Sequence, residues 1–177
     1  MEGRGLRLFF GLPLSADLRD ALARWQQTQA ATRWSRPDGL HVTLAFLGER
    51  PADTLPGLET LASAVAARHR AFALHTATLG GFPRNERTRI LWLGLEPSPA
   101  LNALVQDLRG TLAAAGEAFD PKPFRSHITL ARLRQPRALA AFTGPAPAAF
   151  AADSFALFES RGQGGHTPLR TWHLREV

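Results

Sequence analysis

Leu40-His-Val-Thr-Leu-Ala45 and Ser126-His-Ile-Thr-Leu-Ala131 are two copies of one strand-like hexapeptide. Both place His-x-Thr before a Leu-Ala pair, and their β-branched and aliphatic residues are typical of a β-strand. Alternate side chains of a strand share a face, so the histidine, threonine and alanine of each copy are predicted to point one way. The apolar residues between them then point to the core.

A second repeated segment precedes each hexapeptide. Arg7-Leu-Phe-Phe-Gly-Leu-Pro-Leu-Ser15 aligns with Ile90-Leu-Trp-Leu-Gly-Leu-Glu-Pro-Ser98, including the Gly-Leu pair and the final serine. Leucines with helical spacing follow each serine, and serine is a favoured helix N-cap. The sequence therefore predicts two strand–helix–strand units, over residues 7–47 and 90–132.

The rest of the chain adds strands and one helix. The patterns predict a helix around Leu55–Val65, a strand over Phe72–Thr76, and closing strands at Phe155–Glu159 and Thr171–Val177, joined by the glycine-rich loop Arg161–Gly165. Strands outnumber helices and interleave with them, so we expect an α+β fold. We expect residues 1–177 to form a single, bilobal domain. Its two pseudo-twofold-related lobes would each be an antiparallel-rich sheet with outer helices, around a central cleft.

The composition excludes several kinds of chemistry. The chain has no cysteine and no tyrosine, and among its 21 basic residues only Lys122 is a lysine. Thiol nucleophiles, disulfides, thiolate metal sites and tyrosyl intermediates are therefore excluded. Lys122 lies between two prolines, which indicates a rigid connector rather than an activated amine.

The charge balance favours a polyanionic partner. The formal net charge is +6 and the sequence pI is about 11.4, which is typical of proteins that bind nucleic acid. A general preference for arginine on solvated surfaces explains the same numbers. No apolar run of membrane-spanning length and no signal peptide are evident, so we expect a cytoplasmic protein with no membrane segment, and a monomer.

The duplicated His-x-Thr suggests acid–base chemistry. Two imidazoles facing one cleft can act as one acid and one base in an in-line displacement at phosphorus, and Thr43 and Thr129 can donate to the phosphoryl oxygens. This chemistry requires no metal or organic cofactor. A single His-x-Thr is more often structural, but a duplication has no structural reason to keep two exposed imidazoles. A zinc site lacks a third ligand at close spacing. The four remaining histidines have no motif context and are interpreted as structural or solvated: His69, His75, His166 and His173.

These motifs resemble the two-histidine phosphoesterases, and within them the RNA 2′,3′-cyclic phosphodiesterases, also called 2′-5′ RNA ligases. The resemblance covers nearly the whole chain. It rests on Arg7–Pro13, Leu40–Gly48, Ile90–Leu93, Phe124–Arg132 and Leu157–Ser160. Ser126 departs from the family, in which a proline often precedes the second histidine.

The resemblance implies a bilobal α+β fold and roles for individual residues. It implies that His41 is the general acid that protonates the 3′ leaving oxygen and that His127 is the base that activates water. Thr43 and Thr129 would hold the phosphoryl oxygens, while Phe10, Arg132 and, more weakly, Phe46 would line the nucleotide site. Strict alternation puts Arg132 and Phe46 on the faces opposite His127 and His41. Each therefore reaches the cleft only if its strand ends or twists there.

The leading hypothesis is metal-independent hydrolysis of an RNA or nucleotide 2′,3′-cyclic phosphate to a 2′-phosphate. The first alternative is ATP-independent 2′-5′ RNA ligation by the reverse reaction, in which a 5′-hydroxyl replaces water. The second is a non-catalytic, arginine-rich RNA-binding protein, for which Arg84, Arg87 and Arg89 form a candidate contact loop.

Overall fold

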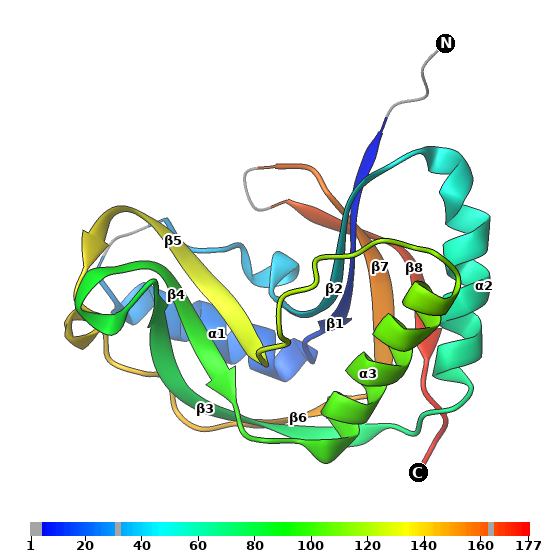
Figure 1. Cartoon of the computed structure of the whole chain (residues 1–177). Coiled ribbons are helices and arrows are strands. Elements are labelled where there is room, and N and C mark those ends of the chain that lie inside the picture. Colours follow the sequence, from blue (N-terminus) through cyan, green and yellow to red (C-terminus); the bar gives the residue numbers. More distant parts are fainter. Residues whose placement is uncertain (1–4, 31–32, 163–164) are drawn as a thin grey trace.

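The two histidine motifs meet at the centre of one curled, antiparallel sheet. The computed structural model describes residues 5–30, 33–162 and 165–177. Within them, eight strands form the sheet in the order β6-β3-β4-β5-β2-β1-β7-β8. Figure 1 shows β3, β4 and β5 to one side of the molecule and β1, β7 and β8 to the other. The elements are β1 (Leu6–Pro13), α1 (Ala16–Thr28), β2 (His41–Arg50), α2 (Leu55–Ala66), β3 (Phe72–Phe82), β4 (Thr88–Leu95), α3 (Pro99–Ala114), β5 (His127–Arg137), β6 (Ala149–Ala152), β7 (Ser154–Ser160) and β8 (His166–His173).

The repeated segments occupy equivalent places in this sheet. β2 and β5 pair through Val42 and Ile128, the residues between histidine and threonine in each motif. β1 lies beside β2, and β4 lies beside β5. The predicted α+β class is confirmed, whereas two lobes related by a twofold axis stay a prediction.

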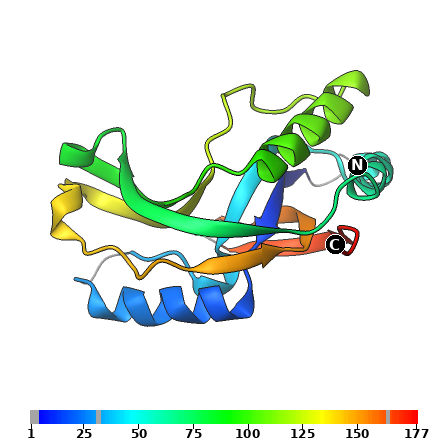
Figure 2. The ribbon, with the colours of Figure 1, turned by 90° about the horizontal axis from the view of Figure 1, so that it is seen from below.

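Apolar stripes account for the described α-helices, and serine caps also fix the start of α1 and α3. The Ser15 and Ser98 side chains accept hydrogen bonds from the backbone N–H groups of Leu18 (3.3 Å) and Leu101 (3.2 Å), so α1 and α3 begin where the sequence predicts. Figure 2 shows α1 along one side of the molecule and α2 and α3 along the other. Leucines of all three helices pack into one core with the sheet. Of the described helices, none has the length and apolar character to cross a bilayer.

A β-bulge in each motif strand reverses the alternation of side chains. In β2, Gly11 pairs with Thr43 and Phe10 pairs with Ala45, so Leu44 is an extra residue. Leu44 and Ala45 are both fully buried. The bulge reverses the alternation of the next side chains, so Phe46 lies on the face of His41 and Thr43; a second register shift follows at Leu47.

The bulge in β5 stands at the same place in its motif. Trp92 pairs with Thr129 and Leu91 pairs with Ala131, so Leu130 is the extra residue. Arg132 is thereby brought to the face of His127 and Thr129. The expectation that Ala45 and Ala131 share the face of the histidines is wrong, because both alanines are fully buried after the bulges.

At both bulges a distant segment donates a hydrogen bond to the carbonyl of the extra residue. Arg109 Nε of α3 donates to the Leu44 carbonyl (2.9 Å). The Ser35 N–H donates to the Leu130 carbonyl (2.7 Å). Buried carbonyls require such partners, so the two bulges are built features of the fold.

The closing part of the chain differs in extent from the prediction. The last strand is His166–His173 rather than Thr171–Val177, and β3 continues to Phe82 rather than ending at Thr76. Part of the glycine-rich loop expected over Arg161–Gly165 lies outside the described residues. The earlier start of β8 matters, because it brings His166 beside Ser160 at the end of β7.

Candidate active site

The two motif histidines have the same backbone hydrogen bond. His41 Nδ1 lies 2.7 Å from the Gly39 carbonyl, and His127 Nδ1 lies 2.7 Å from the Arg125 carbonyl. A carbonyl oxygen only accepts, so Nδ1 carries a proton in both rings. In this tautomer the Nε2 atom of each ring is the one that faces chemistry.

The predicted site residues line two pockets that meet. The inner pocket, of about 180 Å³, contains His41 and Thr43 of β2, Thr129 and Arg132 of β5, and also Arg7 and His166. The aromatic pocket, of about 580 Å³, contains His127 with Phe82, Phe124 and Arg125. Thr43 and Phe46 line both pockets. The structure thus gathers six of the seven predicted residues around one junction: His41, Thr43, Phe46, His127, Thr129 and Arg132.

Phe10 is the exception, and its assignment to the nucleotide site is a mistake. Its side chain is fully buried in the main core, near Phe155 (6.2 Å between ring centroids) and Trp172 (6.0 Å). Phe9 lies on the other face of β1 and lines the inner pocket, with its ring 4.5 Å from the His41 ring. The two adjacent phenylalanines point to opposite faces of the strand, and the motif alone does not show which one faces the site.

His166 is a site residue that the sequence did not reveal. Its ring packs edge-on against the His41 ring (4.9 Å between centroids) and against Phe9 (5.1 Å). Its Nδ1 is buried and, among the residues that the structure describes, has no hydrogen-bond partner. Burial and the positive charge of Arg132 lower its pKa. His166 belongs to no repeated segment. Its pairing beside β7 would have indicated its place at the site, but the predicted last strand began only at Thr171 and left His166 out.

Burial makes His41 a weakly basic imidazole. Desolvation lowers its pKa to about 4; the hydrogen bond to Gly39 partly opposes this shift, and the nearby charges of His166 and His127 add to it. His41 is therefore neutral at pH 7 in the free protein. Its Nε2 lies 3.1 Å from Thr43 Oγ1, so the threonine hydroxyl can donate to it.

Acidification is expected to destabilise the protein through His41. An unfolded histidine takes up its proton near pH 6.5, whereas folded His41 resists protonation down to about pH 4. The unfolded state thus binds more protons between these values, and stability falls as the pH falls through that window. Chemical denaturation of wild type should show a loss of about 3 kcal/mol from this group between pH 6.5 and 4. His41→Gln should lack that part of the loss. If the free energy of unfolding depends on pH equally in the wild type and in His41→Gln, the lowered pKa of His41 is contradicted.

The aromatic pocket has a fixed wall. Arg109 of α3 donates to the carbonyls of Leu44 (2.9 Å) and Lys122 (2.8 Å), and its guanidinium lies over the rings of Phe119 and Phe124. Lys122 is exposed and paired with Asp120 (3.5 Å). Arg109 and Lys122 are thus already engaged, and the third cation of this pocket, Arg125, lies over the Phe82 ring (5.9 Å from its centroid).

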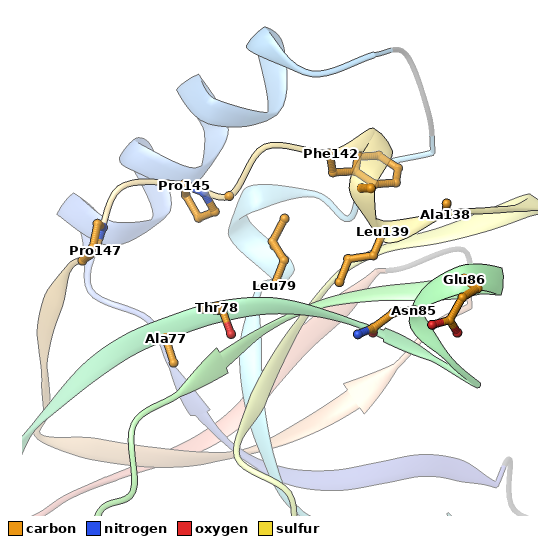
Figure 3. Close-up of a pocket in the computed structure, with 12 residues that line it drawn as sticks. Ala77, Thr78, Leu79, Asn85, Glu86, Ala138, Leu139, Phe142, Pro145 and Pro147 are labelled. Carbon is orange, nitrogen blue, oxygen red and sulfur yellow. The ribbon is translucent and has the colours of Figure 1, made fainter.

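A separate hollow of about 640 Å³ lies away from the histidines (Figure 3). Leu79 of β3 and Leu139 and Phe142 of the segment after β5 point into it. None of the predicted site residues lines it, and its walls are mostly apolar. Within the described ranges, no three His, Asp or Glu side chains are grouped to hold a metal ion.

Comparison with known proteins identifies the family. A model of the 2′-5′ RNA ligase superfamily matches residues 13–164. The chain belongs to this superfamily. The resemblance drawn from the motifs is thereby confirmed. One similar protein is the RNA 2′,3′-cyclic phosphodiesterase of Escherichia coli K12, which is 36% identical over 96% of this chain and 97% of that protein. Another is the RNA 2′,3′-cyclic phosphodiesterase of Thermus thermophilus, 36% identical over 74% of this chain and 70% of that protein.

Solved structures of the superfamily share the whole fold. Escherichia coli LigT complexed with 3′-AMP superposes with a TM-score of 0.79 at 32% identity, covering 97% of this chain and 99% of that one. The TT0787 protein of Thermus thermophilus superposes with a TM-score of 0.78 at 29% identity, with the same coverage. The curled sheet and its helices are therefore those of the superfamily.

Proposed function

We propose that this chain hydrolyses the 2′,3′-cyclic phosphate of an RNA end or nucleotide to a 2′-phosphate, without a metal ion. The observation that carries this proposal is the matched pair of imidazoles. Both are held through Nδ1 by a backbone carbonyl, and they flank the junction of the two pockets. The names of the similar proteins agree with this reaction.

The reaction follows from placing the phosphorus at that junction. His127 Nε2 takes a proton from water while the water oxygen bonds to phosphorus, and the P–O3′ bond breaks as His41 gives a proton to O3′. Thr43 and Thr129 donate to the non-bridging oxygens, and Arg132 adds charge that suits a phosphate. The assignment of acid and base follows the family resemblance.

His41 must take up a proton before it can act as the acid. Its pKa of about 4 in the free protein reflects mainly its burial, to which the neighbouring His166 and His127 add. A cyclic phosphate in the inner pocket brings a negative charge to the ring, and an adjacent opposite charge raises the pKa of an imidazole. Substrate binding is therefore what charges His41, and a proton held on such a weak base is readily given up to the leaving oxygen.

Turnover in chelator is the direct test. Nucleoside 2′,3′-cyclic phosphates should be hydrolysed at an unchanged rate in EDTA, because two imidazoles and two hydroxyls supply all the groups that the reaction needs. ³¹P NMR should show the 2′-phosphate as the product. Activity that disappears in EDTA and returns with a divalent metal would overturn metal independence, and a 3′-phosphate product would overturn the orientation.

The reverse reaction is a second candidate, favoured by the presence of two hollows at the histidine pair. If water is replaced by the 5′-hydroxyl of a second strand, the same acid and base form a 2′-5′ linkage without ATP. Incubating an RNA with a 2′,3′-cyclic end and an RNA with a 5′-hydroxyl, and digesting the product with a 3′-5′-specific nuclease, separates the two activities.

A purely RNA-binding role remains the third hypothesis. Arg84, Arg87 and Arg89 line neither pocket at the histidines, and Arg89 donates to the Arg134 carbonyl (3.3 Å). Salt-dependent RNA binding without turnover of any cyclic phosphate would favour this role. The monomeric state and the cytoplasmic location also stay predictions.

A further inference from the structure

A fourth hollow, which we call the arginine groove, continues from the inner pocket. It has a volume of about 730 Å³, within the range of pockets that hold a nucleotide-sized ligand. The arginine groove and the inner pocket share five lining residues: Arg7, Ser35, Arg132, Ser160 and His166. Arg33, Trp34 and Arg134 line only the groove. A ligand with its reacting phosphate beside His41 can therefore extend into this groove.

The groove is positively charged and lacks a counter-charge. Arg7, Arg33, Arg132 and Arg134 line it, and its lining contains no Asp or Glu. Among the described residues, none of these guanidinium groups lies within 4.0 Å of a carboxylate; Arg7 lies over the Phe46 ring instead, 5.1 Å from its centroid. Four neighbouring arginines that have no carboxylate partner among the described residues suit several phosphate groups.

The wall that carries Arg33 and Trp34 is held in place by the bulge of β5. Trp34 bridges to Ala131, and the Ser35 N–H donates to the Leu130 carbonyl (2.7 Å). The Trp34 indole also packs edge-on against Trp25 (5.2 Å) and Phe142 (6.1 Å). An anchored indole beside unpaired arginines is a typical combination for single-stranded nucleic acid.

The aromatic pocket on the other side has the opposite character. Arg109 donates to two backbone carbonyls and Lys122 is paired with Asp120. Arg125 lies over the Phe82 ring, and Phe46, Phe82 and Phe124 supply aromatic lining. Such a surface suits a base rather than phosphates. The arginine groove thus fits the phosphates of a nucleotide chain, whereas the aromatic pocket fits a base.

We infer that the arginine groove binds the phosphodiester backbone of an RNA strand on the 5′ side of the reacting nucleotide, whose base lies in the aromatic pocket. This inference rests on the proposed function, and it assigns a binding role to Arg33, Trp34 and Arg134. The preferred substrate is then a strand with a 2′,3′-cyclic end rather than a mononucleotide.

The test compares kcat/KM for a nucleoside 2′,3′-cyclic phosphate with that for a short RNA ending in the same nucleotide. At low salt the RNA should be favoured by roughly 10- to 100-fold, because several phosphates are neutralised in the groove. Arg33→Ala and Arg134→Ala should each reduce this advantage and lower the salt dependence of log KM by about 0.7 per lost contact. Arg24→Ala, on the exposed face of α1, is the matched control and should change neither substrate.

The outcomes separate this inference from the proposed function. If neither substrate turns over, the proposed function fails. If both turn over equally, or if the two arginine variants lose nothing on RNA, the groove assignment is overturned while the function stands. The kcat/KM for a nucleoside 2′,3′-cyclic phosphate that carries a 5′-triphosphate distinguishes binding of an RNA strand from binding of any polyphosphate. If it matches the RNA, the groove holds a nucleotide polyphosphate and the strand assignment is wrong.

Discussion

His41→Ala and His127→Ala are each expected to lower kcat for a nucleoside 2′,3′-cyclic phosphate by roughly 10²–10⁴-fold, since each removes one proton-transfer partner. Steady-state kinetics on the purified variants measures the loss. His75→Ala is the matched control, because His75 is exposed on β3 and lines neither pocket at the histidine pair. Full activity in either motif variant would overturn the acid–base mechanism.

A substrate with a different leaving group shows which of His41 and His127 is the acid and which is the base. In a cyclic substrate with sulfur at the 3′ bridging position, the departing thiolate needs no proton. His41→Ala should then lose little relative to wild type, while His127→Ala should keep its full defect. The reverse pattern would exchange the two roles and leave the rest of the mechanism unchanged.

Phe10→Ala is expected to destabilise the protein by about 3–5 kcal/mol, the usual cost of removing a fully buried phenylalanine ring. Its ring lies near Phe155 and Trp172, away from the histidines, so the folded variant should keep the wild-type KM and the wild-type midpoint of His41 titration. Chemical denaturation and NMR titration measure the two effects.

Phe9→Ala provides the contrast, since the Phe9 ring lies 4.5 Å from the His41 ring. Removing it admits water to His41, and the His41 pKa should rise from about 4 toward the ordinary value. Phe10→Leu, a smaller change, keeps the comparison possible if Phe10→Ala does not fold. A Phe10 variant that moves the His41 titration, or a Phe9 variant that does not, would contradict the assignment of these two faces.

The histidine pair of the candidate site could be predicted because duplication makes it visible within a single sequence. His41 and His127 stand in matching contexts, and a strand places histidine and threonine on one face whatever its neighbours are. The serine caps of α1 and α3 depend on hydrogen bonds three residues away, so they too are encoded locally. These features need no information from distant parts of the chain.

The residues that could not be placed all depend on pairing between segments. The carbonyls of the bulge residues Leu44 and Leu130 accept hydrogen bonds from Arg109 and Ser35, which are far away in sequence. The bulges in turn bring Phe46 and Arg132 to the site, against the strict alternation that the sequence suggested. His166 is at the site because β8 pairs with β7, and no local pattern contains that information.

The unequal surroundings of the two histidines have a consequence for the product. A perfectly symmetrical pair of imidazoles could not distinguish the 2′-oxygen from the 3′-oxygen of a cyclic phosphate, and would release both isomers. Here Phe9 and His166 pack on His41, while Phe82 and Trp92 flank His127. The two surroundings differ at one matched position of the repeat, where Phe9 corresponds to Trp92, and through His166 and Phe82, which lie outside the repeat. We expect these differences to make the site directional and to set the regiochemistry of the proposed reaction.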